Sequence, residues 1–226
     1  MLRGTKAPVC LPTSSSSIFR FWRIPAVRYK MSVKSKRQRC VGSSCHHGPT
    51  NTYHVSSPVG TMELVSCPRG LHYMSQTDET DEYFTPDKSI EVMVTSQKYQ
   101  DNGYTYKPLL LGVDWLRHYF KGQHKCQVSP TICASVFKEG SFTAKVWKTL
   151  PEKVKFGHSV SYTQLADLSG NIKACRAVGA AMKANPIQLI IPCHRVLPEG
   201  GGVGNYSGGN KNKMKLWLLK HEGVIK

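Results

Sequence analysis

The chain has 226 residues and a mass of 25.2 kDa, which is enough for one large domain or two small ones. Its 31 Lys and Arg residues outweigh 14 Asp and Glu residues, and the net charge of +17 favours nucleic acid or an anionic membrane surface as partner. No apolar stretch approaches the roughly 18–20 residues of a membrane span, so we expect no membrane insertion. The eight cysteines are irregularly spaced, which excludes a small secreted disulfide framework and favours a reducing compartment.

The N-terminal residues 1–50 are predicted to form a disordered basic tail, because they are poor in acid and rich in Ser, Arg and Lys. Residues 1–62 contain ten Lys or Arg and no Asp or Glu, yet the rest of the chain still holds 21 basic against 14 acidic residues. The start of the tail has the composition of a mitochondrial presequence. The stretch "KSKRQR" is equally compatible with a nuclear signal or a DNA-attracting arm. We predict a nuclear protein, with the mitochondrial presequence as the alternative.

Residues 51–138 are predicted to form a small α/β domain. Between residues 53 and 76, three short alternating or β-branched runs are separated by Ser-Pro-Val-Gly and Pro-Arg-Gly turns, which predicts an antiparallel meander. A polar, mostly acidic loop follows. Helical spacing of Leu109, Val113, Leu116 and Phe120 then predicts a helix that Gly122 ends.

Residues 139–226 are predicted to form a helical domain. Ser141 is the expected N-cap of one helix, and Ser161 is the expected N-cap of a second at residues 162–169. A turn at Gly170-Asn171 leads into a third helix at 172–184, which is thin because it is rich in Ala and Gly. Helix, turn and helix with a basic charge indicate DNA binding.

Cys193 follows a buried-type apolar run and precedes His194 and Arg195. A neighbouring base or cation lowers the pKa of a thiol, and the thiolate is the reactive form. On an extended segment adjacent side chains point apart, so His194 would act only after a turn or through a bridging water. Such a base needs an orienting acceptor, and Glu222 is the best acidic candidate.

The loop after Cys193 contains six glycines between Gly200 and Gly209, together with Tyr206 and Ser207. Flexible backbone with one aromatic ring suits a flat, hydrogen-bonding ligand such as a nucleobase rotated out of duplex DNA. No phosphate-binding Gly-Lys-Ser/Thr loop occurs, so we expect no nucleotide cofactor.

The stretches "IPCHRV", "VGNYSGG" and "WLLKHEG", with "KVKFGHSVSYTQLADLSGN" and "KACRAVGAAMKANP" before them, resemble the alkylguanine–DNA alkyltransferase family. The resemblance covers about residues 53–223. It implies an α+β protein in which a ribonuclease H-like N-terminal domain precedes a winged helix-turn-helix domain. It also implies a monomeric suicide repair protein that needs no cofactor for catalysis. One alkyl group would pass from the 6-oxygen of a flipped guanine to Cys193.

The resemblance also assigns roles to individual residues. His194 would deprotonate Cys193 through water, Glu222 would orient the imidazole, and Asn185 would brace the site. Tyr162 would press on a phosphate and donate a proton to the departing guanine. Arg176 would fill the gap left in the duplex. The other expected DNA contacts are Thr143, Thr163, Asn171, Ala174 and Glu199. The expected pocket residues are Val196, Tyr206, Ser207 and Lys215.

Two departures from the family pattern concern the DNA side of the site. The stretch "GGNKNKMKLWLL" is about two residues longer than expected, which affects the assignment of Lys215. Glu199 stands where a small polar residue would face DNA, and its carboxylate would repel phosphate.

Family members of vertebrate type carry a structural zinc in the first domain. Cys67 and His72 match two of the ligands, and Cys133 stands where a histidine is expected. For the first ligand, Cys45 is closest in type, while His46 and His47 are closest in position. The alternative is that Cys67 is a buried strand residue without a metal.

Two other functions compete with alkyl transfer. The first is a non-catalytic reader of alkylated DNA or a helix-turn-helix regulator on the same scaffold, against which the presence of Cys193 argues. The second is a cysteine hydrolase using Cys193 and His194, which leaves the basic surface and Arg176 unexplained.

Overall fold

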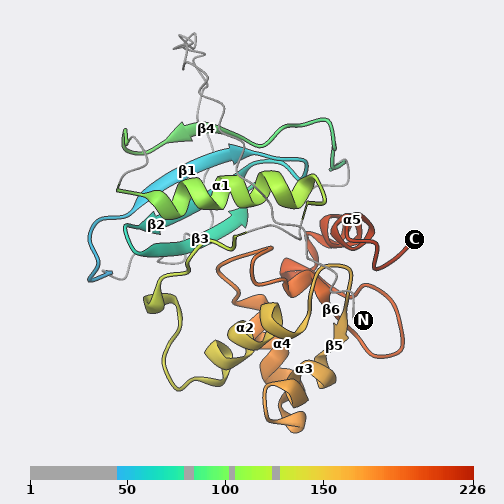
Figure 1. Cartoon of the computed structure of the whole chain (residues 1–226). Coiled ribbons are helices and arrows are strands. Elements are labelled where there is room, and N and C mark those ends of the chain that lie inside the picture. The colour runs from blue at the N-terminus through green and yellow to red at the C-terminus, as the bar shows by residue number, and fades with distance from the viewer. Residues whose placement is uncertain (1–44, 79–83, 102–104, 124–127) are drawn as a thin grey trace, which may run out of the picture. The chain divides into compact units, whose positions relative to one another are not determined.

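A computed structural model describes residues 45–78, 84–101, 105–123 and 128–226 (Figure 1). Its sheet contains four antiparallel strands in the order β3-β2-β1-β4: β1 is Asn51–Ser56, β2 Met62–Cys67, β3 Gly70–Gln76 and β4 Met93–Gln97. The predicted meander is β1 to β3. Sequence reasoning missed β4, an edge strand whose side chains are nearly all exposed and therefore show no alternation of apolar and polar residues.

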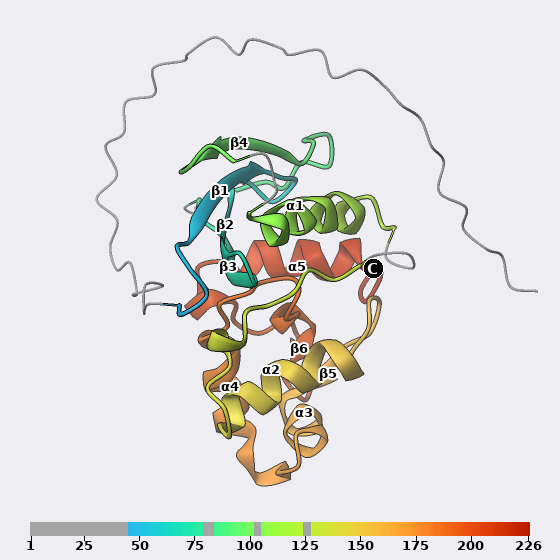
Figure 2. The ribbon, with the colours of Figure 1, turned by 60° about the vertical axis from the view of Figure 1, so that its left-hand side comes forward.

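Helix α1 (Lys107–Phe120) lies across one face of this sheet, as Figures 1 and 2 show. Pro108 occupies its first turn, and Leu109, Val113 and Leu116 are fully or almost fully buried on its inner face. Gly122 follows with φ of 70°, a conformation that glycine adopts without strain. The predicted helix is thus present, and Gly122 follows its C-cap Lys121 as the predicted stop.

The C-terminal half contains the predicted helices. Ser141 accepts a hydrogen bond from Ala144 N and begins α2 (Phe142–Lys153). Ser161 and Gln164 form a capping box at the start of α3 (Tyr162–Leu168). The third predicted helix begins as a 3₁₀ turn, η2 (Ile172–Ala174), and continues as α4 (Cys175–Lys183), which packs against α2 and α3.

The chain then returns to the middle of the structure. The buried run 187–191 leads into the 3₁₀ turn η3 (Cys193–Arg195) and β6 (Val196–Leu197). Strand β6 pairs in parallel with β5 (Val160–Ser161), so the end of the cysteine motif lies beside the start of α3. The short turn η4 (Ser207–Gly209) and α5 (Asn212–His221) complete the fold.

The sheet and the C-terminal helices share one core of buried side chains. Backbone hydrogen bonds also link them: Met74 N donates to Pro186 O at 2.9 Å, and Gln188 N donates to Met74 O at 2.7 Å. The predicted mixed α+β class is confirmed. The domain boundary at 138/139 stays a prediction, and of the predicted tail 1–50 only residues 45–50 are described. Within the described residues, no helix combines the length and apolar composition needed to cross a membrane.

Candidate active site

Cys193 is 6% exposed and stands at the start of η3. Cys193 N donates to Ile191 O at 2.8 Å, and Arg195 N donates to Pro192 O at 2.9 Å. The extended segment considered in the sequence analysis is therefore a tight turn with about three residues per turn. The turn directs the thiol towards Asn185 and Tyr206, and it directs the two side chains that follow towards Glu222.

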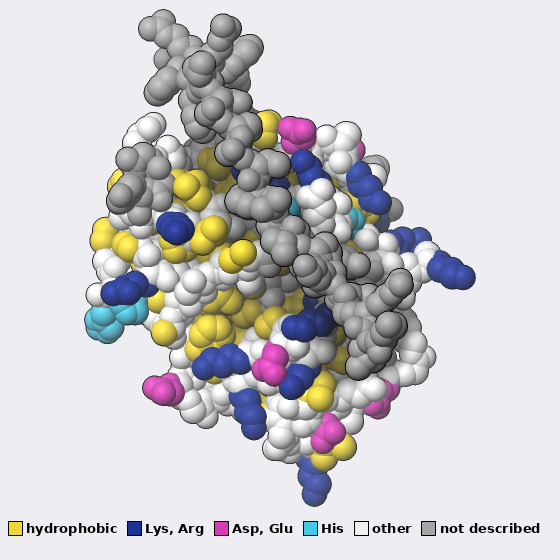
Figure 3. Space-filling view, in the orientation of Figure 1, with side chains coloured by type: hydrophobic (Ala, Val, Ile, Leu, Met, Phe, Trp, Pro, Cys, Tyr) yellow, Lys and Arg dark blue, Asp and Glu magenta, His cyan; other side chains and the backbone are white. Residues whose placement is uncertain are grey.

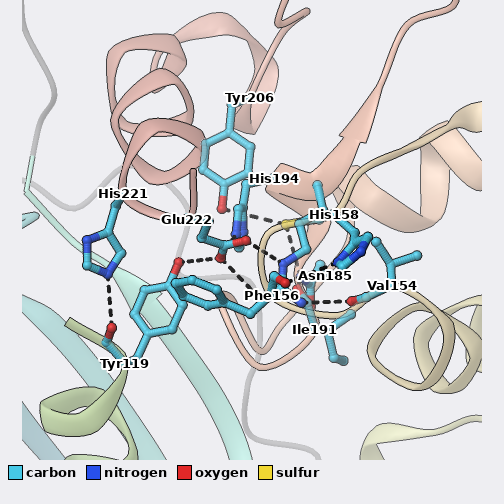
Figure 4. Close-up of polar contacts among 12 residues, drawn as sticks. Tyr119, Val154, Phe156, His158, Asn185, Ile191, His194, Tyr206, His221 and Glu222 are labelled. Atoms are coloured by element: carbon cyan, nitrogen blue, oxygen red, sulfur yellow. Dashed lines mark hydrogen bonds and ion pairs between the residues drawn. The ribbon is translucent and has the colours of Figure 1, made fainter. Parts of the chain in front are cut away.

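Asn185 holds the thiol in place. Its Nδ2 donates to Cys193 Sγ at 3.1 Å and to Ile191 O at 2.8 Å, while its Oδ1 accepts from Ile187 N at 2.9 Å. On the other side, the thiol of Cys193 donates to Tyr206 Oη at 3.6 Å. The structure thus brings Asn185 and Tyr206 to the cysteine from opposite directions (Figure 4).

His194 and Arg195 both bond Glu222, the residue after α5. Figure 4 shows His194 beside Glu222. His194 Nε2 lies 2.7 Å from Glu222 Oε1. Arg195 Nε donates to Oε2 at 2.7 Å, and its Nη2 donates to Oε1 at 3.1 Å. His194 and Glu222 were predicted to pair, whereas sequence reasoning gave Arg195 no partner. Among the described residues His194 Nδ1 is buried and has no hydrogen-bond partner.

Burial and charge act against each other in this group. Burial raises the pKa of Cys193, although the Asn185 amide, Tyr206 and Lys215 favour the thiolate. Burial lowers the pKa of His194 in spite of Glu222, so the neutral imidazole is favoured. Burial alone would raise the pKa of Glu222, but His194 and Arg195 outweigh it and hold that pKa well below its usual range. The result is a protonated thiol beside a neutral base and an ionised carboxylate.

A cavity of about 190 Å³ opens at Cys193. It is lined by Tyr162, Gly179, Met182, Lys183, Cys193, Asn205, Tyr206 and Ser207. Tyr162, Cys193, Tyr206 and Ser207 were predicted for the site, whereas the lining residues of α4 and Asn205 of the loop were not.

Two residues predicted for the pocket, Lys215 and Val196, lie outside the cavity lining. Lys215 is buried, and its Nζ donates to Val196 O at 2.8 Å. Burial lowers the pKa of Lys215 to about 8.

The residues predicted to contact DNA lie on or beside α2, α3 and α4. Arg176, Asn171 and Glu199 are exposed, and Thr143, Thr163, Ala174 and Tyr162 are partly exposed. Exposed basic side chains accompany them at Lys145, Lys148, Lys173 and Lys183. Lys and Arg side chains are spread over the face seen in Figure 3. The exposed lysines on and beside α2, α3 and α4 can therefore attract the phosphates of DNA.

A second cluster lies away from the cavity residues. The ligand-type atoms of Cys45, His47, Cys67 and Cys133 all lie within 4.8 Å of one another. Gly70 allows this close approach, because a side chain there would meet the backbone N of Cys133 at 2.5 Å. His72, the predicted ligand, is not in the cluster. Its Nδ1 lies 3.5 Å from Ser135 Oγ, and that hydroxyl stands between His72 and Cys133 Sγ. The cluster thus contains both Cys45 and His47, the two alternatives that the sequence offered for the first ligand, and it lacks His72.

Sequence reasoning missed two residues that bond the predicted site residues. Tyr119 of α1 donates to Glu222 Oε1 at 2.6 Å, and Asn212 Oδ1 accepts from Tyr206 N at 2.7 Å in the pocket loop. Tyr119 is 103 residues from Glu222, and no local pattern marks it. Asn212 lies in the stretch that is longer than the family pattern, which is the only sequence signal for it.

Comparison with known proteins agrees with this site. Residues 141–224 match the family described as 6-O-methylguanine DNA methyltransferase, DNA binding domain. The methylated-DNA–protein-cysteine methyltransferase of Mus musculus is 42% identical over 180 residues, which cover 75% of this chain and 80% of that protein. This chain belongs to the methylated-DNA–protein-cysteine methyltransferase family. The predicted resemblance is thereby confirmed.

Other relatives extend the likeness beyond the cysteine motif. The Homo sapiens member is 41% identical over 172 residues, covering 75% of this chain and 78% of its own length. Among solved structures, Mycobacterium tuberculosis OGT in complex with DNA is 29% identical with a TM-score of 0.55. That likeness covers 75% of this chain and 91% of the other. The methyltransferase fold therefore includes the sheet as well as the C-terminal helices.

Proposed function

We propose that this protein repairs duplex DNA by moving one alkyl group from the 6-oxygen of a guanine to Cys193, once per molecule. The observation that carries the proposal is the buried thiol in the wall of a cavity beside α3 and α4, held by Asn185 and backed by the His194–Glu222 pair. The relatives' name states the same chemistry. The competing cysteine hydrolase would need an oxyanion hole and repeated turnover, and it leaves the basic surface and the exposed Arg176 unexplained.

The groups around Cys193 support a balanced sequence of steps. The proton of Cys193 passes to His194, whose Nδ1 is buried and unpaired among the described residues and so is ready to accept it, through water as the family pattern implies. The thiolate attacks the alkyl carbon. A C–S bond forms, the C–O bond breaks, and its electron pair stays with the guanine. Tyr162 donates a proton to that guanine and regains one from solvent, while His194 returns its own proton to solvent.

DNA binding is assigned to the helix-turn-helix of α3 and α4. We infer that residues 139–226 are a winged helix-turn-helix domain and residues 51–138 a ribonuclease H-like domain. The thin helix α4 would enter the minor groove, where readout is degenerate and any sequence can be searched. Exposed Arg176 would occupy the place of the flipped base. Thr143, Thr163, Asn171 and Ala174 would contact the backbone, and Ser207, which lines the cavity, would bind guanine through its main-chain amide.

A structural zinc ion is proposed for Cys45, His47, Cys67 and Cys133. Tetrahedral zinc with bonds of about 2.3 Å to sulfur and 2.0 Å to nitrogen separates its ligands by about 3.8 Å (S to S) and 3.5 Å (S to N). Here Cys45 Sγ lies 3.7 Å from Cys133 Sγ, and these sulfurs lie 3.3 and 3.4 Å from His47 Nδ1. The donor set therefore fits zinc, which would tie residues before β1 to the sheet and take no part in alkyl transfer.

The location and assembly of the protein remain proposals from sequence. We propose a nuclear monomer, with the mitochondrial presequence as the alternative. The residues that carry these signals, including "KSKRQR", lie outside the described residues.

The decisive experiment measures the intact mass of the protein after incubation with a duplex that contains one 6-O-methylguanine. We expect a single gain of one CH₂, complete at one equivalent of DNA and absent from Cys193→Ala. Cys175→Ala is the matched control, because that thiol is partly exposed on α4 and lies outside the cavity lining. An unchanged mass in the presence of tight binding would support the non-catalytic reader instead.

A further inference from the structure

The carboxylate of Glu222 has a donor from outside the cysteine motif. Tyr119 of α1 donates its O–H to Glu222 Oε1 at 2.6 Å, and both side chains are buried (Figure 4). Tyr119 lies outside residues 141–224, the part of the chain that matches the DNA-binding family. A residue of the sheet-and-α1 half therefore takes part in the hydrogen bonding of the active site.

Glu222 Oε1, which accepts from Tyr119, is also the partner of the proposed base, His194. Glu222 Oε1 lies 2.7 Å from His194 Nε2 and 3.1 Å from Arg195 Nη2, in addition to its bond with Tyr119. Tyrosine and arginine only donate here, so they favour the ionised carboxylate, which only accepts. His194 must then carry its hydrogen on Nε2. That tautomer leaves Nδ1 with a free lone pair.

Tyr119 is itself firmly held. Its ring stacks on Trp115 with centroids 5.2 Å apart, and it meets Phe120 and Phe156 edge to face at 5.2 and 5.9 Å. Its carbonyl oxygen accepts from His221 Nε2 at 2.9 Å. A hydroxyl on so crowded a ring cannot swing away, so it fixes the carboxylate as well as donating to it.

We propose that Tyr119 is a positioning residue for alkyl transfer, which acts through Glu222 to set the tautomer and basicity of His194. The proposal rests on the proposed function, because His194 must be the group that accepts the proton of Cys193. Tyr119 itself does not touch the thiol or DNA in this scheme.

The charges around His194 and Glu222 determine whether loss of Tyr119 raises or lowers the pH at which His194 loses its proton. The groups facing His194 and Glu222 are Cys193 and Arg195 from η3, Lys215 from α5, Tyr206 from the pocket loop and Tyr119 from α1. Loss of the Tyr119 O–H leaves more negative charge on Oε1 for His194. The protonated imidazole is then more stable and must lose its proton at a higher pH before it can accept one from Cys193.

The experiment compares single-turnover rates of full-length protein with a 6-O-methylguanine duplex from pH 5.5 to 9.5. For Tyr119→Phe we expect the acidic limb of the rate profile to move to higher pH. At the acidic end the rate should fall roughly tenfold, as for the loss of one hydrogen bond to a charged group, and recover most of this at the alkaline end. Tyr53→Phe is the matched control: Tyr53 is buried and donates to Asp101 Oδ2 at 2.9 Å, far from the cysteine in sequence and on another element.

A second variant keeps the test valid if Tyr119→Phe folds poorly. 3-Fluorotyrosine at position 119 keeps the ring shape and is a stronger donor, so the acidic limb should move to lower pH. A rate that falls by one constant factor at every pH, or no more than in Tyr53→Phe, would assign Tyr119 a packing role and overturn the proposal. An unmoved profile with 3-fluorotyrosine would do the same. Failure of the proposed function would appear separately, as no mass gain in the unaltered protein.

Discussion

Asn185 shows how one side chain organises the reactive cysteine. It bonds the thiol, the carbonyl of Ile191 and the amide of Ile187, so it fixes both the sulfur and the turn that carries it. Because burial raises the pKa of Cys193, the Asn185 donor is one of the few groups that favour the thiolate. The same amide thus serves structure and reactivity.

Replacing Asn185 should slow the thiol before any DNA is present. For Asn185→Ala we expect the pKa of Cys193 to rise and its rate of alkylation by iodoacetamide at pH 7.4 to fall roughly tenfold, as for one lost hydrogen bond to a charged group. The deficit should shrink towards pH 9.5, where thiolate forms without help. The readout is the mass of the Cys193 peptide over time. Asn171→Ala is the control, since Asn171 is exposed and caps η2. Superimposable curves for Asn185→Ala and the unaltered protein would contradict this role.

At the scale of elements, the start of α3 and the loop after β6 are joined by one hydrogen bond. Ser161 Oγ accepts from Gln164 N at 3.1 Å as the helix cap and donates to Glu199 Oε1 at 3.0 Å. The parallel pairing of β5 with β6 brings these residues together. The exposed carboxylate of Glu199 therefore stands beside the helix-turn-helix, where phosphate is expected.

Removing that charge should strengthen DNA binding. Glu199→Gln keeps an oxygen acceptor for Ser161, and we expect affinity for undamaged duplex to rise about two- to fivefold at low salt, because one repulsive charge is lost. Fluorescence anisotropy at two salt concentrations measures it. Glu91→Gln removes an exposed charge beside β4 and serves as control. If Glu199→Gln binds no better than Glu91→Gln, the loop after β6 lies away from the phosphates.

In the molecule as a whole, several kinds of contact join the sheet and α1 to the C-terminal helices. They share a continuous core, the backbone of Met74 bonds the chain at Pro186 and Gln188, and Tyr119 bonds Glu222. The cysteine cluster lies within the N-terminal part and links residues before β1 to the end of β2 and to Cys133. We expect this cluster to control the stability of the sheet rather than the chemistry.

Zinc removal tests that expectation. We expect about one zinc per chain by elemental analysis, and a chelator should lower the melting temperature by several degrees while leaving the rate of alkyl transfer at 20 °C nearly unchanged. Cys67→Ala should lose both the zinc and the chelator response, whereas Cys175→Ala should keep them. A zinc-free protein whose melting temperature does not respond to added zinc would rule out the metal. His72→Ala should retain zinc and His47→Ala should lose it, if the ligand set is the one proposed.

The chemistry-bearing residues could be predicted because they stand close together in the chain and carry a rare combination of types. Cys193 with His194, the glycine-rich loop, and the capped helix with a turn and a second helix after it are all local patterns; the structure contains that helix pair as α3, η2 and α4. The edge strand β4 escaped prediction because its exposed side chains show no alternation. The sequence left the conformation at Cys193 open between an extended segment and a turn, because the periodicity of a short apolar run does not distinguish a strand from a helical segment.

Sequence patterns alone identified the family and predicted the nucleophile, the base and its acidic partner, because covalent chemistry needs particular side chains and these stand in short local motifs. The tertiary structure decided which distant groups surround them. Tyr119 meets Glu222 across 103 residues, and His47 rather than His72 meets the three cysteines. These contacts depend on how α1 packs on the sheet and on how the chain turns before β1. Only packing creates them, so no short-range sequence pattern predicts them.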